Sequence, residues 1–298
     1  MNQGARRETQ ATGQDVCLES RVPRPESVSV PLFDAYAPAQ MAVRVRDIGV
    51  AKATAPVLTT LALAVLAGAF ISLGALFYTV TVTYAADGPA APFGLTRLAG
   101  GIAFSLGLIL VVVGGAELFT GNNLIAMAWA AGRLSSGQVL RNWVWVYAGN
   151  LLGALGTVAL VLLAGVHQLN DGSLGETAIR IARAKVSLDP VQAAARGVLC
   201  NVLVCLAVWL CMAARSVTDK ILAIVFPISA FVACGFEHSV ANMYFLPVGI
   251  ALASSADAPI AWAGAFGNLA YVTLGNILGG TVLVAMVYWF IYLRGEKR

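Results

Sequence analysis

The chain has 298 residues, of which 59% are hydrophobic and 11% are charged, with a formal net charge of +4 at pH 7 and a mean hydropathy of +0.79. So few charges cannot solubilise a globular surface of this size, and the composition therefore indicates an integral membrane protein. The basic residues are scattered rather than clustered, which argues against a nucleic-acid partner.

The first 56 residues divide into two parts. Residues 1–30 are polar, carry charges and contain Pro23 and Pro25, and they lack the apolar residues that a core requires, so we expect a disordered N-terminal tail. In residues 31–56, apolar side chains such as Tyr36 and Val45 alternate with charged ones, which suits an amphipathic helix on the membrane surface. A solvated linker is the alternative interpretation.

Residues 57–294 form a predicted transmembrane domain, and residues 295–298 a short C-terminal tail. The domain contains six apolar segments, at about 57–84, 96–131, 138–166, 190–213, 220–254 and 262–293. Each segment exceeds the roughly twenty residues that a helix needs to cross a hydrocarbon core of about 30 Å.

The second and fifth segments share the motif Gly-x-Glu-x4-Asn near their middles. It runs from Gly115 to Asn122 in the second segment and from Gly235 to Asn242 in the fifth. Glycine and polar side chains interrupt an apolar helix, so we predict that both helices are broken there. Such a break is tolerated at membrane depth only where protein or a cavity satisfies the freed backbone groups.

A second motif recurs after each glutamate, as Gly149-Asn150-Leu151-Leu152-Gly153 and as Gly275-Asn276-Ile277-Leu278-Gly279. Glycines four residues apart allow two membrane helices to approach closely, and the asparagine can hydrogen-bond across the contact. Lining of a polar path is the other interpretation of Asn150 and Asn276. Since each half has three crossings, the second copy must cross in the opposite sense. We therefore predict an all-α fold of two inverted three-helix repeats.

The distribution of Lys and Arg predicts the orientation in the membrane. Most basic residues fall on the side of the N-terminus, and the opposite side holds Arg97, Arg180, Arg183, Lys185 and Arg196. By the positive-inside rule, we expect a multi-pass protein of the inner membrane with both termini in the cytoplasm.

His238 is the histidine that lies within an apolar segment. An unperturbed imidazole has a pKa near 6.5, so it can donate a hydrogen bond or a proton to the anion of a weak acid near neutral pH. A packed histidine satisfied by a neighbouring backbone group is the alternative. Without a metal-ligand cluster, the pattern favours transport over catalysis, and no cofactor is expected.

Glu117 and Glu237 occupy matching places, and two bare carboxylates would repel a transported anion. We therefore expect a scaffold role, in which they accept hydrogen bonds from backbone amides freed at the breaks, with Asn122 and Asn242 assisting. A proton relay through Glu237 is the competing hypothesis.

Apolar residues near the breaks are candidates for constrictions. Phe104 and Leu108 lie one helical turn apart, and Phe231 precedes His238 by two turns. Such side chains can form apolar rings that make an ion lose its water, although the same spacing also occurs in ordinary helix packing.

These motifs resemble the formate/nitrite transporter family, and its formate channel branch in particular. The most specific stretch is Phe231-Val232-Ala233-Cys234-Gly235-Phe236-Glu237-His238-Ser239-Val240-Ala241-Asn242-Met243. The stretches 100–110, 115–120, 141–143, 149–154, 204–209 and 275–280 also resemble the family.

The resemblance implies an aquaporin-like six-helix protomer in a pentamer, with an anion path in each protomer. It implies a central pore histidine at His238, facing Thr120. It further implies that Leu108, Phe104 and Phe231 are constriction residues and that Leu118 and Phe119 belong to a gating loop. It also implies that Lys185 attracts anions and that Asn201 and Asn276 are polar residues beside the path.

The expected substrate is formate, with the lipid bilayer as surroundings. Nitrite, hydrosulfide or another small monocarboxylate remain alternatives, because the spacing of residues cannot separate them. An aquaporin-type channel for neutral solutes would show twin Asn-Pro-Ala motifs and a selectivity arginine. Neither occurs in the two segments predicted to be broken.

Overall fold

The computed structural model describes residues 34–84, 92–253 and 259–295. The predicted tail of residues 1–30 and residues 296–298 lie outside the described residues. Contacts divide the chain into Met1–Asp34 and Ala35–Arg298, and the second unit holds every described helix. The described part contains helices and no strands, which confirms the predicted all-α class.

The helices follow one another along the chain with short connections. They are α1 (Pro38–Thr54), α2 (Val57–Val82), α3 (Phe93–Gly114), η1 (Gly121–Ile125), α4 (Ala126–Ala130), α5 (Ser136–Leu163), η2 (Val166–Gln168), α6 (Ser173–Val186), α7 (Pro190–Ala213), α8 (Val217–Ala233), α9 (Ser239–Ala253), α10 (Trp262–Ile277), η3 (Leu278–Met286) and α11 (Val287–Tyr292).

Within the described residues, five helices are long and apolar enough to cross a membrane: α2, α3, α5, α7 and the continuous run Trp262–Tyr292. The helix α9 is also apolar but has 15 residues, and α8 has 17 residues. Both are shorter than the roughly twenty residues that one straight crossing requires.

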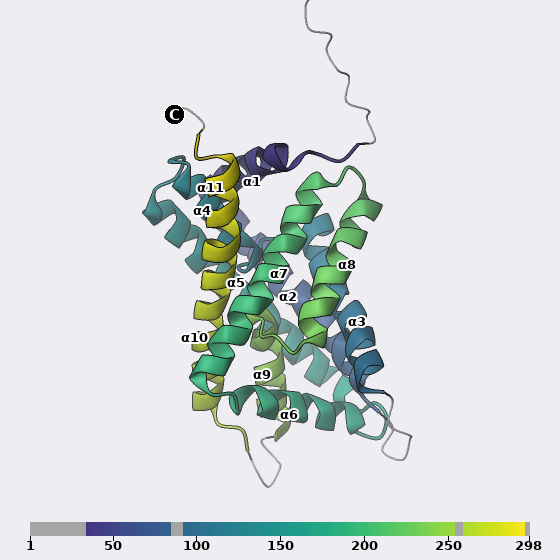
Figure 1. Cartoon of the computed structure of the whole chain (residues 1–298). Coiled ribbons are helices and arrows are strands. Elements are labelled where there is room, and N and C mark those ends of the chain that lie inside the picture. Colours follow the sequence, from purple (N-terminus) through teal and green to yellow (C-terminus); the bar gives the residue numbers. More distant parts are fainter. Residues whose placement is uncertain (1–33, 85–91, 254–258, 296–298) are drawn as a thin grey trace, which may run out of the picture. The chain divides into compact units, whose positions relative to one another are not determined.

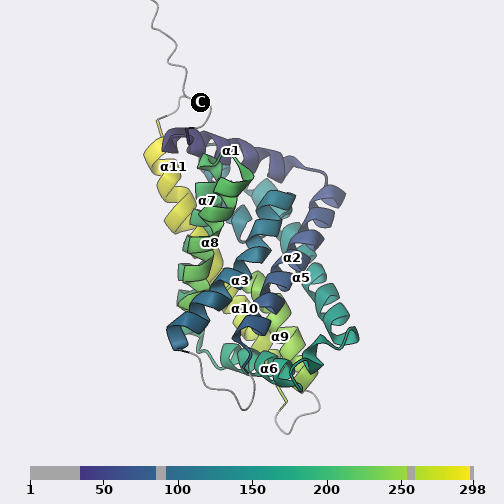
Figure 2. The same ribbon diagram turned by 90° about the vertical axis from the view of Figure 1, so that its right-hand side faces the viewer.

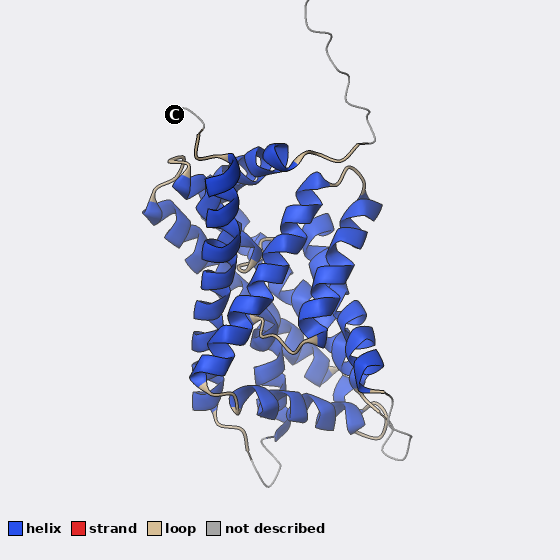
Figure 3. Ribbon diagram, in the orientation of Figure 1, coloured by secondary structure: helices blue, strands red, loops and turns tan. Residues whose placement is uncertain are grey.

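Helices α3 and α8 both end at the start of the repeated glutamate motif. Gly115 and Gly235 have φ values of +81° and +72°, which favour glycine because other residues meet a steric penalty there. The next amide donates back into the helix, from Ala116 N to Val111 O at 2.9 Å and from Phe236 N to Phe231 O. This is the Schellman ending of a helix. Figure 3 shows both coil segments inside the helical bundle, not at its ends.

Glycines bring α2 against α5 and α7 against α10 until the backbones touch. A Cβ atom on Gly153 would lie 2.0 Å from Val65 O, and one on Gly279 would lie 2.2 Å from Val198 O. Backbone contact of this kind leaves no room for a methyl group, as the spacing of the second motif predicted.

The helices α1 and α6 lie across opposite ends of the bundle, and α11 ends beside α1 (Figures 1 and 2). Within residues 31–56 the structure has the helix α1 at Pro38–Thr54, which buries Met41, Val45 and Gly49 against the bundle. The helix α6, which we did not predict separately, buries Leu174 and Ala178. The placement of α1 on the membrane surface stays a prediction.

The last long helix widens into a π-helix at Leu278–Met286. The wide turns bring Gly280 against α7, where a Cβ atom would lie 2.4 Å from Asn201 Nδ2 and 2.8 Å from Cys205 Sγ. Further along, the ring of Tyr288 stacks on Trp209 with centroids 3.9 Å apart. The sequence did not predict this widening, because its composition is that of an ordinary apolar helix.

Gly153→Ala is expected to destabilise the protein by about 1–3 kcal/mol, because the added methyl group would force α2 and α5 apart. Gly156→Ala on the same helix is the matched control, since a Cβ atom there meets nothing within 4 Å and alanine favours the helix. Thermal unfolding of the detergent-solubilised variants measures both effects. Equal melting temperatures for Gly153→Ala and the wild-type protein would contradict the backbone contact between α2 and α5.

Candidate functional site

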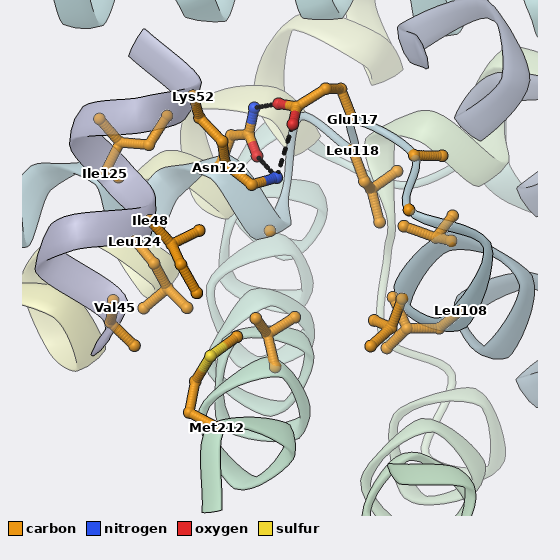
Figure 4. A pocket seen from close by; sticks show the side chains of 17 residues that line it. Val45, Ile48, Lys52, Leu108, Glu117, Leu118, Asn122, Leu124, Ile125 and Met212 are labelled. Carbon is orange, nitrogen blue, oxygen red and sulfur yellow. Dashed lines mark hydrogen bonds and ion pairs between the residues drawn. The ribbon is translucent and has the colours of Figure 1, made fainter. Parts of the chain in front are cut away.

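Four polar residues form a closed network near the end of α3, and Figure 4 shows three of them, Lys52, Glu117 and Asn122. Lys52 Nζ lies 2.9 Å from Glu117 Oε1 and donates to Asn122 Oδ1 at 3.0 Å. Asn122 Nδ2 donates to Glu117 Oε2 at 2.6 Å and to Asn142 Oδ1 at 3.0 Å. Asn142 in turn donates to the carbonyl of Lys52. The ion pair and the amides therefore satisfy one another inside an apolar environment.

The second half of the chain repeats this network with the same residue types. Lys185 Nζ lies 2.9 Å from Glu237 Oε1 and 3.0 Å from Oε2. Asn242 Nδ2 donates to Glu237 Oε2 at 2.7 Å and to Asn268 Oδ1 at 2.8 Å, and Asn268 donates to the carbonyl of Lys185. The copies differ at the lysine, because Lys52 also donates to Asn122 Oδ1, whereas Lys185 bonds both oxygens of Glu237 and Asn242 Oδ1 has no partner among the described residues.

Asn150 and Asn276 satisfy the backbone of the two coil segments. Asn150 Oδ1 accepts from Phe119 N at 2.9 Å, and its Nδ2 donates to Glu117 O and Ala64 O. Asn276 does the same for Ser239 N, Glu237 O and Gly197 O. Each asparagine thus makes two hydrogen bonds to backbone groups at a helix break, which a continuous helix would have paired itself. The third hydrogen bond goes to a carbonyl of the neighbouring helix, Ala64 O of α2 or Gly197 O of α7.

One cavity of about 210 Å³ opens beside α1. Figure 4 shows Lys52, Asn122 and Glu117 at one side of it, with Leu108 and Met212 among its apolar walls. Lys52 and Glu117 are the charged residues that line it, and the other lining side chains are mostly aliphatic.

Another cavity, of about 180 Å³, is lined by His238 and by Lys185, Glu237 and Asn242 of the second network. It lies under α6, which contributes Ile181, Ala184 and Lys185. Arg97 and Arg196 also line it, so basic side chains outnumber the carboxylate of Glu237. The predicted basic residue Lys185 therefore lies on a cavity wall, where its ammonium is paired with Glu237.

His238 and Thr120 are in direct contact, which joins the two coil segments. Thr120 Oγ1 lies 2.9 Å from His238 Nε2, and the two residues are 0% and 3% exposed. The backbone amide of Ala241 donates to Nδ1 at 3.0 Å. An amide can only donate, so Nδ1 carries no proton, and in the neutral imidazole the proton is on Nε2. Nε2–H therefore donates to the Thr120 hydroxyl oxygen.

The three predicted constriction residues line the two cavities. Phe104 and Phe231 line the cavity that contains His238, and their rings meet edge to face at 5.6 Å. The Phe231 ring also stacks on the imidazole at 6.0 Å. Leu108 lines the cavity beside α1, as does Leu118. Phe231 thus lies against His238, and the constricting role of the three residues stays a prediction.

Phe119 and Asn201 lie beside the Thr120–His238 contact and line neither cavity. The Phe119 ring packs on Tyr147 at 4.9 Å and on Trp143 at 6.2 Å. Asn201 Nδ2 donates to Asn276 O at 2.7 Å and, at 3.3 Å, to the carbonyl of Thr120. Their contacts are those of residues that hold the coil segments in position.

Lys52, Asn142 and Asn268 were not predicted as site residues. The signal was present, since the order Lys, Glu, Asn, Asn, Asn recurs in both halves, from Lys52 to Asn150 and from Lys185 to Asn276. Arg97 and Arg196 were also missed as cavity-lining residues. Their positions near the ends of predicted helices gave no indication that they meet at one cavity.

Comparison with known proteins identifies the family. The model of the formate/nitrite transporter family matches residues 39–290. The chain belongs to the formate/nitrite transporter family. The matched residues include both networks and both coil segments, and the relatives named below are channels and transporters, not enzymes.

Two curated proteins are similar to this chain over most of its length. The formate channel FocA of Escherichia coli K12 is 44% identical over 278 residues, covering 88% of this chain and 96% of that protein. A probable formate transporter of Methanothermobacter thermautotrophicus is 42% identical, covering 86% and 97%. A solved pentameric formate channel with formate bound has a TM-score of 0.73 and 42% identity, covering 80% and 98%.

Asn276→Leu is expected to lower stability by about 2–5 kcal/mol, because it leaves Ser239 N and the carbonyl of Glu237 without partners in the interior. Gln192→Leu is the matched control, because Gln192 is exposed in the first turn of α7. Chemical or thermal unfolding in detergent measures the difference. A loss no larger than that of Gln192→Leu would contradict the scaffold role of Asn276.

Proposed function

We propose that this protein is a formate channel in which His238 and Thr120 bind the permeating anion. One observation carries the proposal: the contact between Thr120 and His238 joins the coil segments that line the two cavities. Leu118 and Gly121, on either side of Thr120, line the cavity beside α1, and His238 lines the cavity under α6. A solute passing from one cavity to the other meets this pair.

Formate is favoured over nitrite as the substrate. The curated relatives at 44% and 42% identity are named a formate channel and a probable formate transporter, and the solved relative contains formate. Both anions are small and monovalent, and the donors near His238 suit either. The choice between them therefore rests on the relatives.

The apolar side chains near the pair make dehydration the main cost of passage. Leu108 on one side, and Phe104 and Phe231 on the other, offer no hydrogen bonds to an anion. A carboxylate taken out of water loses several kcal/mol of solvation even after the protein relaxes. Apolar rings of this kind exclude ions that cannot recover this loss.

His238 and Thr120 return part of the lost solvation. The imidazole donates through Nε2–H, and the Thr120 hydroxyl hydrogen has no acceptor among the residues that the structure describes. A hydrogen bond to a charged group contributes about 1.5–3 kcal/mol. Two such bonds offset much of the cost for the anion, and protonation of formate to formic acid removes the charge and the remaining cost. Flux is therefore expected to rise as the pH falls.

The residues around the pair divide into attracting, gating and supporting roles in this proposal. Lys185, although paired with Glu237, and the two arginines together give the cavity under α6 the net positive charge that draws anions into it. Leu118 and Phe119 lie on the coil segment that changes conformation during gating. The hydrogen bonds described above support both coil segments. They involve Glu117, Glu237, Asn122, Asn242, Asn150, Asn201 and Asn276.

The membrane arrangement that we propose has six crossings. In this arrangement α3 with η1 and α4 forms one broken crossing, and α8 with α9 forms another, within two inverted repeats of an aquaporin-like protomer. The excess of Lys and Arg on the side of α1 supports cytoplasmic termini in an inner membrane. The solved relative is a pentamer, which supports a pentamer here.

His238→Phe is expected to reduce formate flux in proteoliposomes by about 10- to 100-fold at neutral pH, since one charge-assisted hydrogen bond of about 1.5–3 kcal/mol is lost. His238→Gln keeps an N–H donor and should retain more flux than His238→Phe. His167→Phe is the matched control, because His167 lines a separate surface cavity. Unchanged flux in His238→Phe would exclude the imidazole from the mechanism.

The pH dependence of flux separates anion passage from passage of the neutral acid. The concentration of formic acid rises about tenfold for each unit by which the pH falls, when total formate is constant. Wild-type flux should rise less steeply, because the anion also passes with the help of His238. In His238→Phe the rise should approach tenfold per unit. Identical slopes for both proteins, measured by stopped-flow uptake, would contradict this assignment.

A further inference from the structure

The two cavities differ in charge although their networks match. In the cavity beside α1, the positive charge of Lys52 is cancelled by Glu117. In the cavity under α6, Lys185 is likewise paired with Glu237, but Arg97 and Arg196 also line the wall. The first cavity is formally neutral, and the second has an excess of two positive charges.

Hydrogen bonds hold both arginines at the end of α8. Arg97 donates from Nε to Ala233 O at 3.0 Å and from Nη2 to Val232 O at 2.8 Å. Arg196 donates from Nη1 to Gly235 O at 3.5 Å, a weak bond. Within the described residues neither arginine has an acidic partner. Both guanidinium groups therefore keep their full charge beside the cavity.

The carbonyl end of α8 offsets only part of this charge. A helix terminus carries about half a negative charge, and α3 ends beside the other cavity in the same way. Because the partial negative charges of the two helix ends are equal, they do not contribute to the difference in charge between the cavities. That difference comes from the two arginines. Arginine presents several N–H donors in a planar fork, which suits an anion with two oxygen atoms.

We propose that Arg97 and Arg196 form a binding site for a small monovalent carboxylate in the cavity under α6, before the constriction at Phe104 and Phe231. This inference rests on the proposed channel function. The cavity of about 180 Å³ has room for an anion of a few heavy atoms with its water, but not for the headgroup and chains of a lipid. The site makes the two mouths of the channel unequal.

In a passive channel, the difference between the two mouths can change the half-saturating concentration on each side but not the direction of net flux. Net flux must vanish when the electrochemical potential of formate is equal on both sides, so the arginines cannot pump the anion in one direction. They can hold formate at the α6 mouth, which lowers the concentration that half-saturates flux from that side. We expect flux from the α6 side to saturate at a lower formate concentration than flux from the α1 side.

Arg196→Gln tests the site, because Arg196 has one weak bond to lose whereas Arg97 anchors the end of α8. Initial formate flux is measured over a range of concentrations in proteoliposomes of defined orientation, from each side in turn. We expect the half-saturating concentration from the α6 side to rise about threefold to tenfold, as for loss of a charge that concentrates an anion. From the α1 side it should change less than twofold. Arg196→Lys should retain most of the wild-type value.

Two controls separate a local site from a general surface charge. Arg180 lies on α6 and bonds to Thr177, and it lines a different, open cavity, so Arg180→Gln should have little effect. Raising the ionic strength with an impermeant salt should raise the wild-type half-saturating concentration on the α6 side toward that of Arg196→Gln. Screening acts over about 10 Å at 0.1 M salt.

The outcomes distinguish this inference from the proposed function. Normal wild-type flux with an unchanged half-saturating concentration in Arg196→Gln would overturn the arginine site and leave the channel function intact. Equal shifts from both sides, or an equal shift in Arg180→Gln, would also overturn the site. Absence of formate flux in the wild-type protein would overturn both.

Discussion

Hydrogen bonds from Asn150 and Asn276 to the coil segments make an interrupted interior possible. Where α3 and α8 end, amides and carbonyls lose their helical partners in a region that offers little water, and each unsatisfied group costs several kcal/mol in an apolar medium. Each asparagine accepts from one freed amide and donates to one freed carbonyl, and the close contact made by the neighbouring glycines brings it within reach. The cavities, the ion pairs and the imidazole are all arranged around these two segments.

The two halves share the same helix breaks and polar networks, but the side chains on their coil segments differ. Counted from the motif glycine, Leu118 in the first half corresponds to His238 in the second, and Thr120 corresponds to Val240. Each half therefore contributes one polar side chain to the central contact, from a different position of the motif. This departure from symmetry yields one threonine and one imidazole in hydrogen-bonding contact, whereas strict symmetry would have opposed two identical groups.

The repeated motifs allowed much of this fold to be predicted from the sequence. Gly115 and Gly235 marked the helix ends, and Glu117, Asn122, Glu237 and Asn242 marked the networks, because buried polar groups in apolar segments require partners. The partners Lys52 and Asn142 were harder to predict, since α1 is amphipathic and its lysine resembles an ordinary surface residue. Arg97 and Arg196 could not be assigned to one cavity from the sequence, because their positions on the same cavity wall depend on how α3 and α7 pack around α8.

The π-helix at Leu278–Met286 makes chain length itself a constraint. An α-helix advances about 100° around its axis with each residue, and wide turns contain additional residues for the same rise. If this segment formed regular α-helical turns with the same number of residues, everything that follows would rotate around the helix axis. Tyr288 would then face away from Trp209, and Gly280 would no longer fit against Asn201. The spacing between the asparagine motif and the aromatic end of the chain is thus fixed by helical phase.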